Sequence, residues 1–136
     1  MKIYVLDSSA VLRFIDREAG AERVKAIFQS CAGGQAESCI SAVQWGEIAA
    51  VQRRRSGARE QERVLANLIE LQLRVVPATA ERAVRAAELR VDHKMSNADS
   101  FAIELAMDSP DHVLVTADYD FKEVADLARI EFLPVK

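Results

Sequence analysis

Short apolar segments alternate with helical segments along this chain, and no other feature of the sequence constrains the fold as strongly. The first apolar run, residues 2–6 (KIYVL), is nearly continuous, as in a strand that is covered on both faces. Further short strands are expected at residues 38–40, 74–76, 112–115 and 130–133. Strands separated by helices favour an α/β fold with a parallel central sheet.

Helices are expected between these strands, and several begin at residues that commonly cap a helix. Ser41, Thr79 and Ser96 each precede a helical segment. Gln44, three residues after Ser41, fits a capping box. Gly57 divides the segment after Ser41 into two helices, which we expect to form a hairpin that projects from the sheet. Shorter helices are expected at residues 8–15, 21–31 and 121–127.

Length and composition limit the classes of protein that this chain can belong to. Its 136 residues predict one domain, residues 1–136. The net charge of −3 excludes a globally basic protein, so a nucleic-acid partner would be bound by local basic patches. Cys31 and Cys39 match no metal or redox spacing. No membrane-length apolar run or long secretory signal is present, which predicts a cytoplasmic protein.

Two aspartates directly follow predicted strands. Asp7 ends the first apolar run, and Asp118 follows the run at 112–115. Ligands of open α/β sheets bind outside the carboxyl ends of the strands, so both positions are candidate binding sites. A helix N-cap at Asp7 and a turn or cap at Asp118 are the structural alternatives. Asp120 competes with Asp118 for the same role.

Two more carboxylates fall on the apolar side of predicted helices. Glu47 has apolar residues at i−4, i+3 and i+4, and Asp99 has them at i+3, i+4 and i+7. Glu47 could instead lie at the margin of its apolar stripe. Asp99 could complete a capping box with Ser96.

The four carboxylates together indicate a site for a divalent cation. Carboxylates that lie close together repel one another and raise each other's pKa. Mg²⁺ or Mn²⁺ removes this repulsion and prefers oxygen ligands. Such a cluster suits metal-assisted hydrolysis of phosphodiesters. Thr116 could donate a hydrogen bond to a neighbouring carboxylate.

Four segments, in this order along the chain, resemble the motifs of the PIN-domain ribonucleases, specifically the VapC-like toxins of VapBC-type toxin–antitoxin systems. They are VLDSSAVL (5–12), SAVQWGE (41–47), MSNAD (95–99) and VLVTADYDF (113–121). The resemblance implies a three-layer α/β/α sandwich with a central parallel five-stranded sheet. It also implies an endoribonuclease dependent on Mg²⁺ or Mn²⁺, usually a homodimer, that is inhibited by a cognate antitoxin.

The resemblance also assigns roles to individual residues. The acidic positions of the family correspond to Asp7, Glu47, Asp99 and Asp118, which would bind the metal and carry catalysis. Ser9 and Thr116 correspond to the supporting hydroxyl residues. The motif position favours Asp118 over Asp120.

Two basic residues are candidate substrate contacts, and two other classes of function are possible for such a chain. Arg90 and Lys94 share a helix face in the segment before Asp99, where they could contact RNA phosphates. A receiver-like phospho-acceptor domain is disfavoured because the first strand offers only one aspartate and the third ends in Val76-Pro77. A catalytically silent PIN-like binding module is the other alternative.

Overall fold

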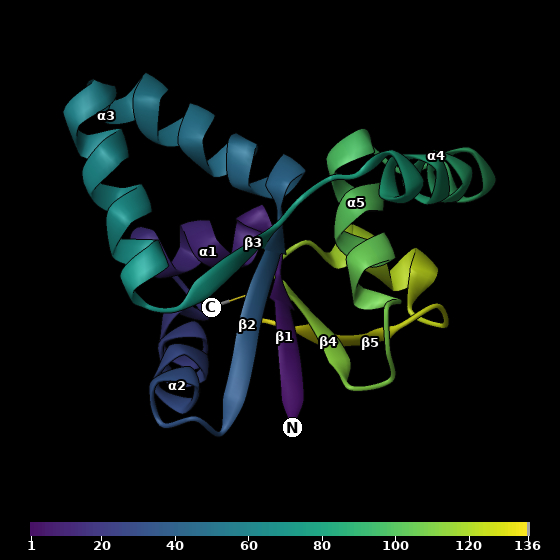
Figure 1. Cartoon of the computed structure of the whole chain (residues 1–136), viewed down its shortest axis with the longest axis horizontal. Coiled ribbons are helices and arrows are strands. Elements are labelled where there is room, and N and C mark those ends of the chain that lie inside the picture. Colours follow the sequence, from purple (N-terminus) through teal and green to yellow (C-terminus); the bar gives the residue numbers. More distant parts are fainter. Residues whose placement is uncertain (136) are drawn as a thin grey trace.

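The structure is a computed structural model that describes residues 1–135, and its centre is one parallel sheet of five strands (Figure 1). The strand order is β3-β2-β1-β4-β5, and all neighbouring strands pair in parallel. The parallel sheet expected from the sequence is therefore confirmed. The strands are β1 (Lys2–Leu6), β2 (Ala36–Ser41), β3 (Leu73–Val76), β4 (His112–Thr116) and β5 (Arg129–Phe132).

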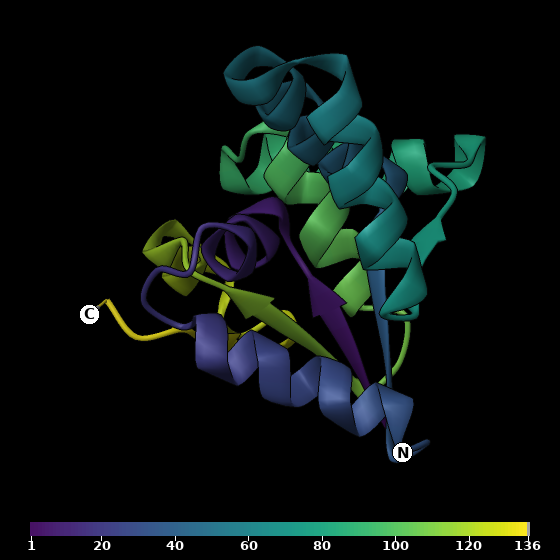
Figure 2. The same ribbon diagram turned by 90° about the vertical axis from the view of Figure 1, so that its left-hand side faces the viewer.

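Helices cover both faces of the sheet. Side chains of α1, α2 and α3 pack on one face, while α5 and the short 3₁₀ helix η1 pack on the other. Figure 2 shows α2 and α5 on opposite sides of the strands. The three-layer α/β/α arrangement is thus confirmed. The helices are α1 (Ser8–Ile15), α2 (Ala21–Ala32), α3 (Ala42–Glu70), α4 (Ala80–His93), α5 (Asn97–Ala106) and η1 (Tyr119–Val124).

The central position of β1 in the sheet explains why the sequence of this strand is nearly all apolar. Successive side chains of a strand point to opposite faces of the sheet. Val5 packs in the cluster on the α5 side, and Leu6 packs in the cluster on the α2 side. Both side chains are fully buried, so neither face of β1 tolerates a polar residue at the two positions before Asp7.

Helix α3 is bent into the hairpin that the sequence predicts. Gly57 has φ 84° and ψ 178°, a non-helical conformation inside the long helical segment. The side-chain amide of Gln61, on the second arm, donates a hydrogen bond to the carbonyl of Ala49 on the first arm at 3.0 Å. Figure 1 shows the two arms rising away from the sheet.

Some local expectations were wrong. The segment expected to be a helix at 121–127 is a 3₁₀ helix that begins at Tyr119. The capping box of Ser41 and Gln44 is not formed: the Ser41 side chain accepts a hydrogen bond from the Val43 N–H at 3.2 Å, and Gln44 contacts other helices. Tertiary hydrogen bonds have replaced the local one that the sequence pattern indicated.

The strand order places a topological switch point between β1 and β4. The chain continues from β1 toward β2 and β3 on one side, whereas β4 and β5 extend the sheet on the other. Crevices that bind ligands form at such a point, outside the carboxyl ends of the strands. Asp7 follows β1 and Asp118 lies two residues beyond β4, so both border this crevice.

The described residues contain neither a membrane-spanning helix nor a disulfide bond. No helix within residues 1–135 has the length and apolar character needed to cross a membrane. Cys31 and Cys39 are buried free thiols, Cys31 on α2 and Cys39 on β2.

Candidate active site

Asp7 is a buried carboxylate, 2% exposed, at the junction of β1 and α1. Its Oδ1 accepts hydrogen bonds from the Ala10 N–H at 2.9 Å and the Ser9 hydroxyl at 2.7 Å. Its Oδ2 accepts a hydrogen bond from the Thr116 hydroxyl at 2.5 Å. Asp7 is therefore the N-cap of α1 and also borders the crevice, so its capping role is compatible with a role in binding.

Burial raises the pKa of Asp7 to about 6, because the charged form loses its water. The hydrogen bonds from Thr116, Ala10 and Ser9 act in the opposite direction, and the nearby Asp99 carboxylate raises the pKa further. Burial therefore makes the charged form of this carboxyl group costly.

The hydroxyl groups of Ser9 and Thr116 connect Asp7 to the end of β4. The Ser9 hydroxyl oxygen accepts a hydrogen bond from the Ala117 N–H at 2.9 Å. The Thr116 hydroxyl oxygen accepts one from the Asp118 N–H, also at 2.9 Å. Because both hydroxyl groups also donate to Asp7, they fix the two sides of the crevice relative to each other.

Asp99 lies in the first turn of α5 and is the electrostatic centre of the acidic group. Burial raises its pKa, and the carboxylates of Asp118, Glu47 and Asp120 raise it further. The Ser96 hydroxyl oxygen accepts a hydrogen bond from the Asp99 N–H at 3.2 Å. The helix-capping interaction expected here is present, and it leaves Asp99 among the other acidic residues.

Glu47 lies beside the acidic group, but on the exposed side of α3 and not on the buried face that the sequence suggested. The buried stripe of the first arm of α3 consists of Gln44, Ile48 and Gln52, and Glu47 is exposed. The prediction that Glu47 lies on the buried face is therefore wrong by one position of the helix. Its Oε1 accepts a hydrogen bond from the Ser8 hydroxyl at 2.9 Å, which places it beside the start of α1.

Asp118 and Asp120 differ in burial and in their effect on the pKa of Asp99. Asp118 is half-buried and caps η1, with its Oδ1 accepting a hydrogen bond from the Asp120 N–H at 2.9 Å. Asp120 is exposed. Both carboxylates raise the pKa of Asp99, and Asp118 has the larger effect. The larger electrostatic effect on Asp99 favours Asp118, as the motif position does, although Asp120 is the one that lines a cavity together with Asp99.

Gln44 is a residue of this site that the sequence reasoning missed. Its side chain is 1% exposed. The amide oxygen accepts a hydrogen bond from the Ser8 N–H at 2.6 Å, and the amide nitrogen donates one to the Ala98 carbonyl at 2.7 Å. Gln44 therefore ties together the starts of α1, α3 and α5, which carry the acidic residues. A polar residue in the buried stripe at i−4 from Ile48 is the sequence signal that could have found it.

The two candidate RNA-contact residues, Arg90 and Lys94, differ in their position relative to the acidic group. Lys94 ends α4 in the left-handed conformation and lines a cavity of about 300 Å³ together with Asp99. Arg90 is exposed on α4 and does not line that cavity. Lys94 is thus the better placed of the two for contact with a molecule bound at the acidic group.

The chemistry of the donor set fits a hard divalent cation. The residues offer carboxylate and hydroxyl oxygens, the ligands that Mg²⁺ and Mn²⁺ prefer. Burial is the main cause of the raised pKa of Asp7 and of Asp99, nearby carboxylates add to it, and a cation bound there would favour the charged form of both groups. Within residues 1–135, no three acidic, histidine or cysteine side chains already converge closely enough to hold an ion. Binding would therefore require these side chains to move closer together.

Comparison with known families agrees with the fold and the motifs. The PIN domain family matches residues 4–127, and the chain belongs to this family. No curated protein sequence matches the chain.

Solved structures with the same fold include VapC toxins and VapBC complexes. VapC20 from Mycobacterium tuberculosis, described as a sarcin-ricin loop cleaving toxin, is 21% identical, with a TM-score of 0.73 over 96% of this chain and 99% of that chain. VapBC2 from Rickettsia felis, bound to a promoter DNA fragment, is 16% identical, with a TM-score of 0.73 over 97% and 99%. VapBC-1 from nontypeable Haemophilus influenzae is 15% identical, with a TM-score of 0.70 over 96% and 97%. At these identities the likeness defines a VapC-like fold.

Proposed function

We propose that this protein is a metal-dependent endoribonuclease that hydrolyses RNA phosphodiester bonds. The observation that carries the proposal is the acidic group at the switch point of the sheet, where Asp99 is electrostatically coupled to Asp7, Glu47 and Asp118. A buried or half-buried carboxylate with a raised pKa makes the folded state less stable when it is charged. Such groups therefore mark candidate functional sites.

Each residue of the site has a separate task in this proposal. Asp7, Glu47, Asp99 and Asp118 would hold Mg²⁺ or Mn²⁺. Ser9 and Thr116 orient the Asp7 carboxylate through the hydrogen bonds described above. When bound, the cation supplies activation of a water molecule and stabilisation of the leaving oxygen.

RNA as substrate is supported by the family and by one of its structural relatives. The VapC20 toxin, which shares this fold, is described as cleaving the sarcin-ricin loop. Lys94 lies on the cavity that includes Asp99, where its ammonium group can contact a phosphate of the substrate. Arg90 would make a more distant contact of the same kind from α4.

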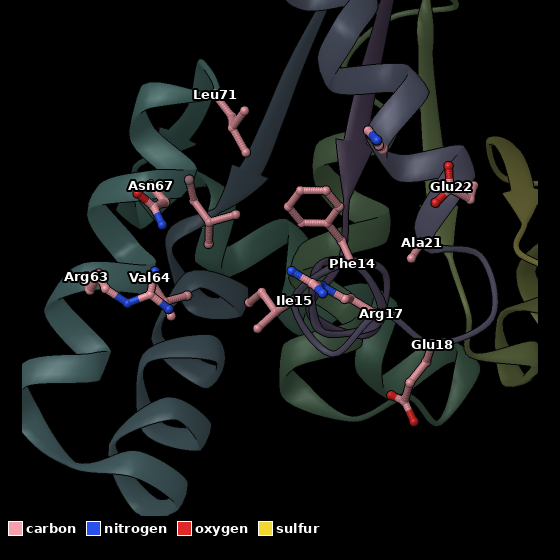
Figure 3. A pocket seen from close by; sticks show the side chains of 12 residues that line it. Phe14, Ile15, Arg17, Glu18, Ala21, Glu22, Arg63, Val64, Asn67 and Leu71 are labelled. Atoms are coloured by element: carbon pink, nitrogen blue, oxygen red, sulfur yellow. The ribbon is translucent and has the colours of Figure 1, made fainter.

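A role as the toxin of a type II toxin–antitoxin module is supported by the relatives that occur as VapBC complexes. An antitoxin could bind at a surface outside the acidic group. A cavity of about 640 Å³ between α1, α2 and the second arm of α3 offers one, and Figure 3 shows Phe14, Ile15 and Leu71 lining it beside Arg63 and Glu22. We propose that the protein acts in the cytoplasm as a single nuclease domain and a homodimer.

The test is cleavage of a single-stranded RNA by the purified protein with Mg²⁺ or Mn²⁺, with EDTA, and by the Asp99→Asn variant. We expect cleavage only by the wild-type protein with the divalent ion. Asp126→Asn, which makes the same change at an exposed position of the loop before β5, should cleave as the wild type does. Cleavage that survives both EDTA and Asp99→Asn would contradict the proposal.

A catalytically silent module would differ in one measurement. Such a module would give no cleavage of RNA under any of these conditions, although the wild-type protein and both variants are folded by circular dichroism. That result would leave the fold and reject the enzymatic function.

A further inference from the structure

A cavity of about 300 Å³ lies beside the acidic group and shares Asp99 with it. One wall is the turn between α4 and α5, and the other is the η1 segment, which lies more than twenty residues further along the chain. This volume is at the lower end of the range for small-molecule sites in proteins. The cavity can therefore hold one small group of a substrate whose reacting atoms lie at Asp99.

The inner part of the cavity is apolar. Phe121 and Val124 of η1 line it and are each 1% exposed, so they belong to the packed core. Met95 lines the opposite wall and is half-buried. The polarisable thioether of Met95 is a suitable contact for a flat aromatic heterocycle, and the buried Phe121 and Val124 make the adjoining surface apolar.

The polar groups of the cavity decide which part of a nucleotide fits. Asp120 and Glu123 line it in addition to Asp99, and the exposed His93 and Lys94 line it as well. Three carboxylates repel a phosphate that enters deeply, whereas they accept hydrogen bonds from amino groups. A neutral base is thus favoured inside the cavity, with its phosphate outside it, beside the exposed Lys94.

The wall formed by the α4–α5 turn is preformed. Lys94 adopts the left-handed conformation, with φ 54° and ψ 48°, and its N–H donates to the Arg90 carbonyl. The Met95 N–H donates to the same carbonyl at 3.2 Å. Since two hydrogen bonds fix this turn, little ordering is needed when a ligand binds.

We propose that this cavity binds the base of a nucleotide adjacent to the scissile phosphate, and that it favours a base with an exocyclic amino group over uracil. Carboxylate oxygens accept from the amino groups of cytosine, adenine and guanine, and uracil has none. The inference rests on the proposed function, because it assigns the cavity to the substrate of that reaction.

The first experiment places an abasic site at each position of a short RNA with one cleavage site, in the presence of Mn²⁺. We expect kcat/KM to fall about tenfold at one position next to the cleaved bond, the change that 1.4 kcal/mol of lost binding produces. This is within the range for one base stacked on a protein side chain. Replacing the base at that position by uracil should cause part of the same loss.

Two variants examine the two kinds of contact. Met95→Ala removes the thioether contact and should reduce the abasic effect. Glu123→Lys replaces an acceptor by a donor at an exposed position, so the preference should move toward uracil, which presents carbonyl oxygens. The matched control is Glu62→Lys, the same substitution at an exposed position of α3 that is outside the cavity. It should keep the wild-type base preference.

Binding without metal gives a second readout. In EDTA, a U-rich hexanucleotide with one cytidine should shift the methyl NMR signals of Met95 and Val124 more than the all-uridine hexanucleotide does. RNA cleavage that is equally fast with abasic sites at every position, together with no such difference in the methyl signals, would overturn the inference. Absence of any RNA cleavage by the wild-type protein would overturn the proposed function instead.

Discussion

The buried carboxylate of Asp7 destabilises the metal-free protein at neutral pH. Its pKa rises from 3.8 to about 6 in the folded state, chiefly because of burial. Between these two values the native state binds more protons than the unfolded state, so stability falls as pH rises through this window. Above about pH 6 the full cost applies, and it amounts to roughly 3 kcal/mol at 1.36 kcal/mol per pKa unit.

We therefore expect Asp7→Asn to stabilise the metal-free protein at pH 7.5 by about 1–3 kcal/mol, since the amide removes the buried charge. The gain should disappear near pH 4, where Asp7 is protonated in the folded state. Urea unfolding in EDTA at the two pH values measures both. Asp126→Asn, at an exposed position, should change neither value. Equal or lower stability of Asp7→Asn at pH 7.5 would contradict this account of Asp7.

Single acidic residues were predictable from the sequence to different degrees. Asp7 follows a continuous apolar run, so its place at the end of a buried strand could be inferred from its neighbours alone. Glu47 could not be placed in this way, because the face of α3 that is buried contains Gln44 and Gln52. Hydrogen bonds from distant residues satisfy Gln44, and such contacts leave no apolar pattern in the sequence.

At the scale of the elements, Gln44 fixes the helices that carry the site. Gln44→Met keeps the length of the side chain but leaves the Ser8 N–H and the Ala98 carbonyl without their partner. Each buried group left unpaired costs about 1–3 kcal/mol. We expect Gln44→Met to lower the free energy of unfolding by this order and to weaken Mn²⁺ binding.

The matched control is Gln52→Met, on the same face of α3. Gln52 is 5% exposed, and its side-chain nitrogen has no hydrogen-bond partner. Its replacement by an apolar side chain should be neutral or stabilising. Urea unfolding and a Mn²⁺ titration of both variants test the comparison. Equal Mn²⁺ affinity of Gln44→Met and the wild type would show that Gln44 supports only the fold.

The bend of α3 depends on one glycine. Gly57 combines φ 84° with ψ 178°, a conformation that is nearly exclusive to glycine. A Cβ atom there would meet no other atom within 4 Å, so the cost of Gly57→Ala is conformational. We expect a loss of about 1–3 kcal/mol in the free energy of unfolding.

Gly46 offers the opposite case on the same helix. It lies in the first arm of α3, and a Cβ atom there also meets nothing within 4 Å. Gly46→Ala should stabilise the protein by about 0.5–1 kcal/mol, because alanine has the higher helix propensity. Chemical denaturation of the two variants tests the pair, and destabilisation by both would contradict the assignment of the bend to Gly57.

The elements themselves were largely predictable, for reasons that are local. Thr79 and Ser96 cap α4 and α5 as the sequence indicated, since capping involves residues two or three positions apart. Gly57 marked the bend for the same reason. The failure of the expected capping box of Ser41 and Gln44 was not predictable, because Gln44 instead binds Ala98, which lies 54 residues away in the sequence.

At the scale of the whole molecule, the order of the strands creates the site. Asp7 and Asp118 are far apart in the sequence, and they border the same crevice because β1 and β4 are neighbours in the sheet. The sequence pattern predicted parallel strands but not their order, since the pairing of distant strands depends on packing across the whole chain. The expectation that the carboxylates converge came from their positions after strands and on the apolar sides of helices, and the motifs in family order supported it.

Binding of a divalent cation should therefore stabilise the whole molecule. A ligand that binds only the folded state adds about 2.7 kcal/mol at one hundred times its dissociation constant. We expect Tm to rise with Mn²⁺ concentration in the wild-type protein, and NaCl at equal ionic strength to give a smaller rise that reflects screening alone. Asp118→Asn should abolish most of the Mn²⁺ effect, whereas Asp120→Asn should retain it, because Asp118 is more strongly coupled to Asp99. A Tm that does not respond to millimolar Mn²⁺ would contradict a metal site at the switch point, and loss of the response in Asp120→Asn alone would transfer the ligand role to Asp120.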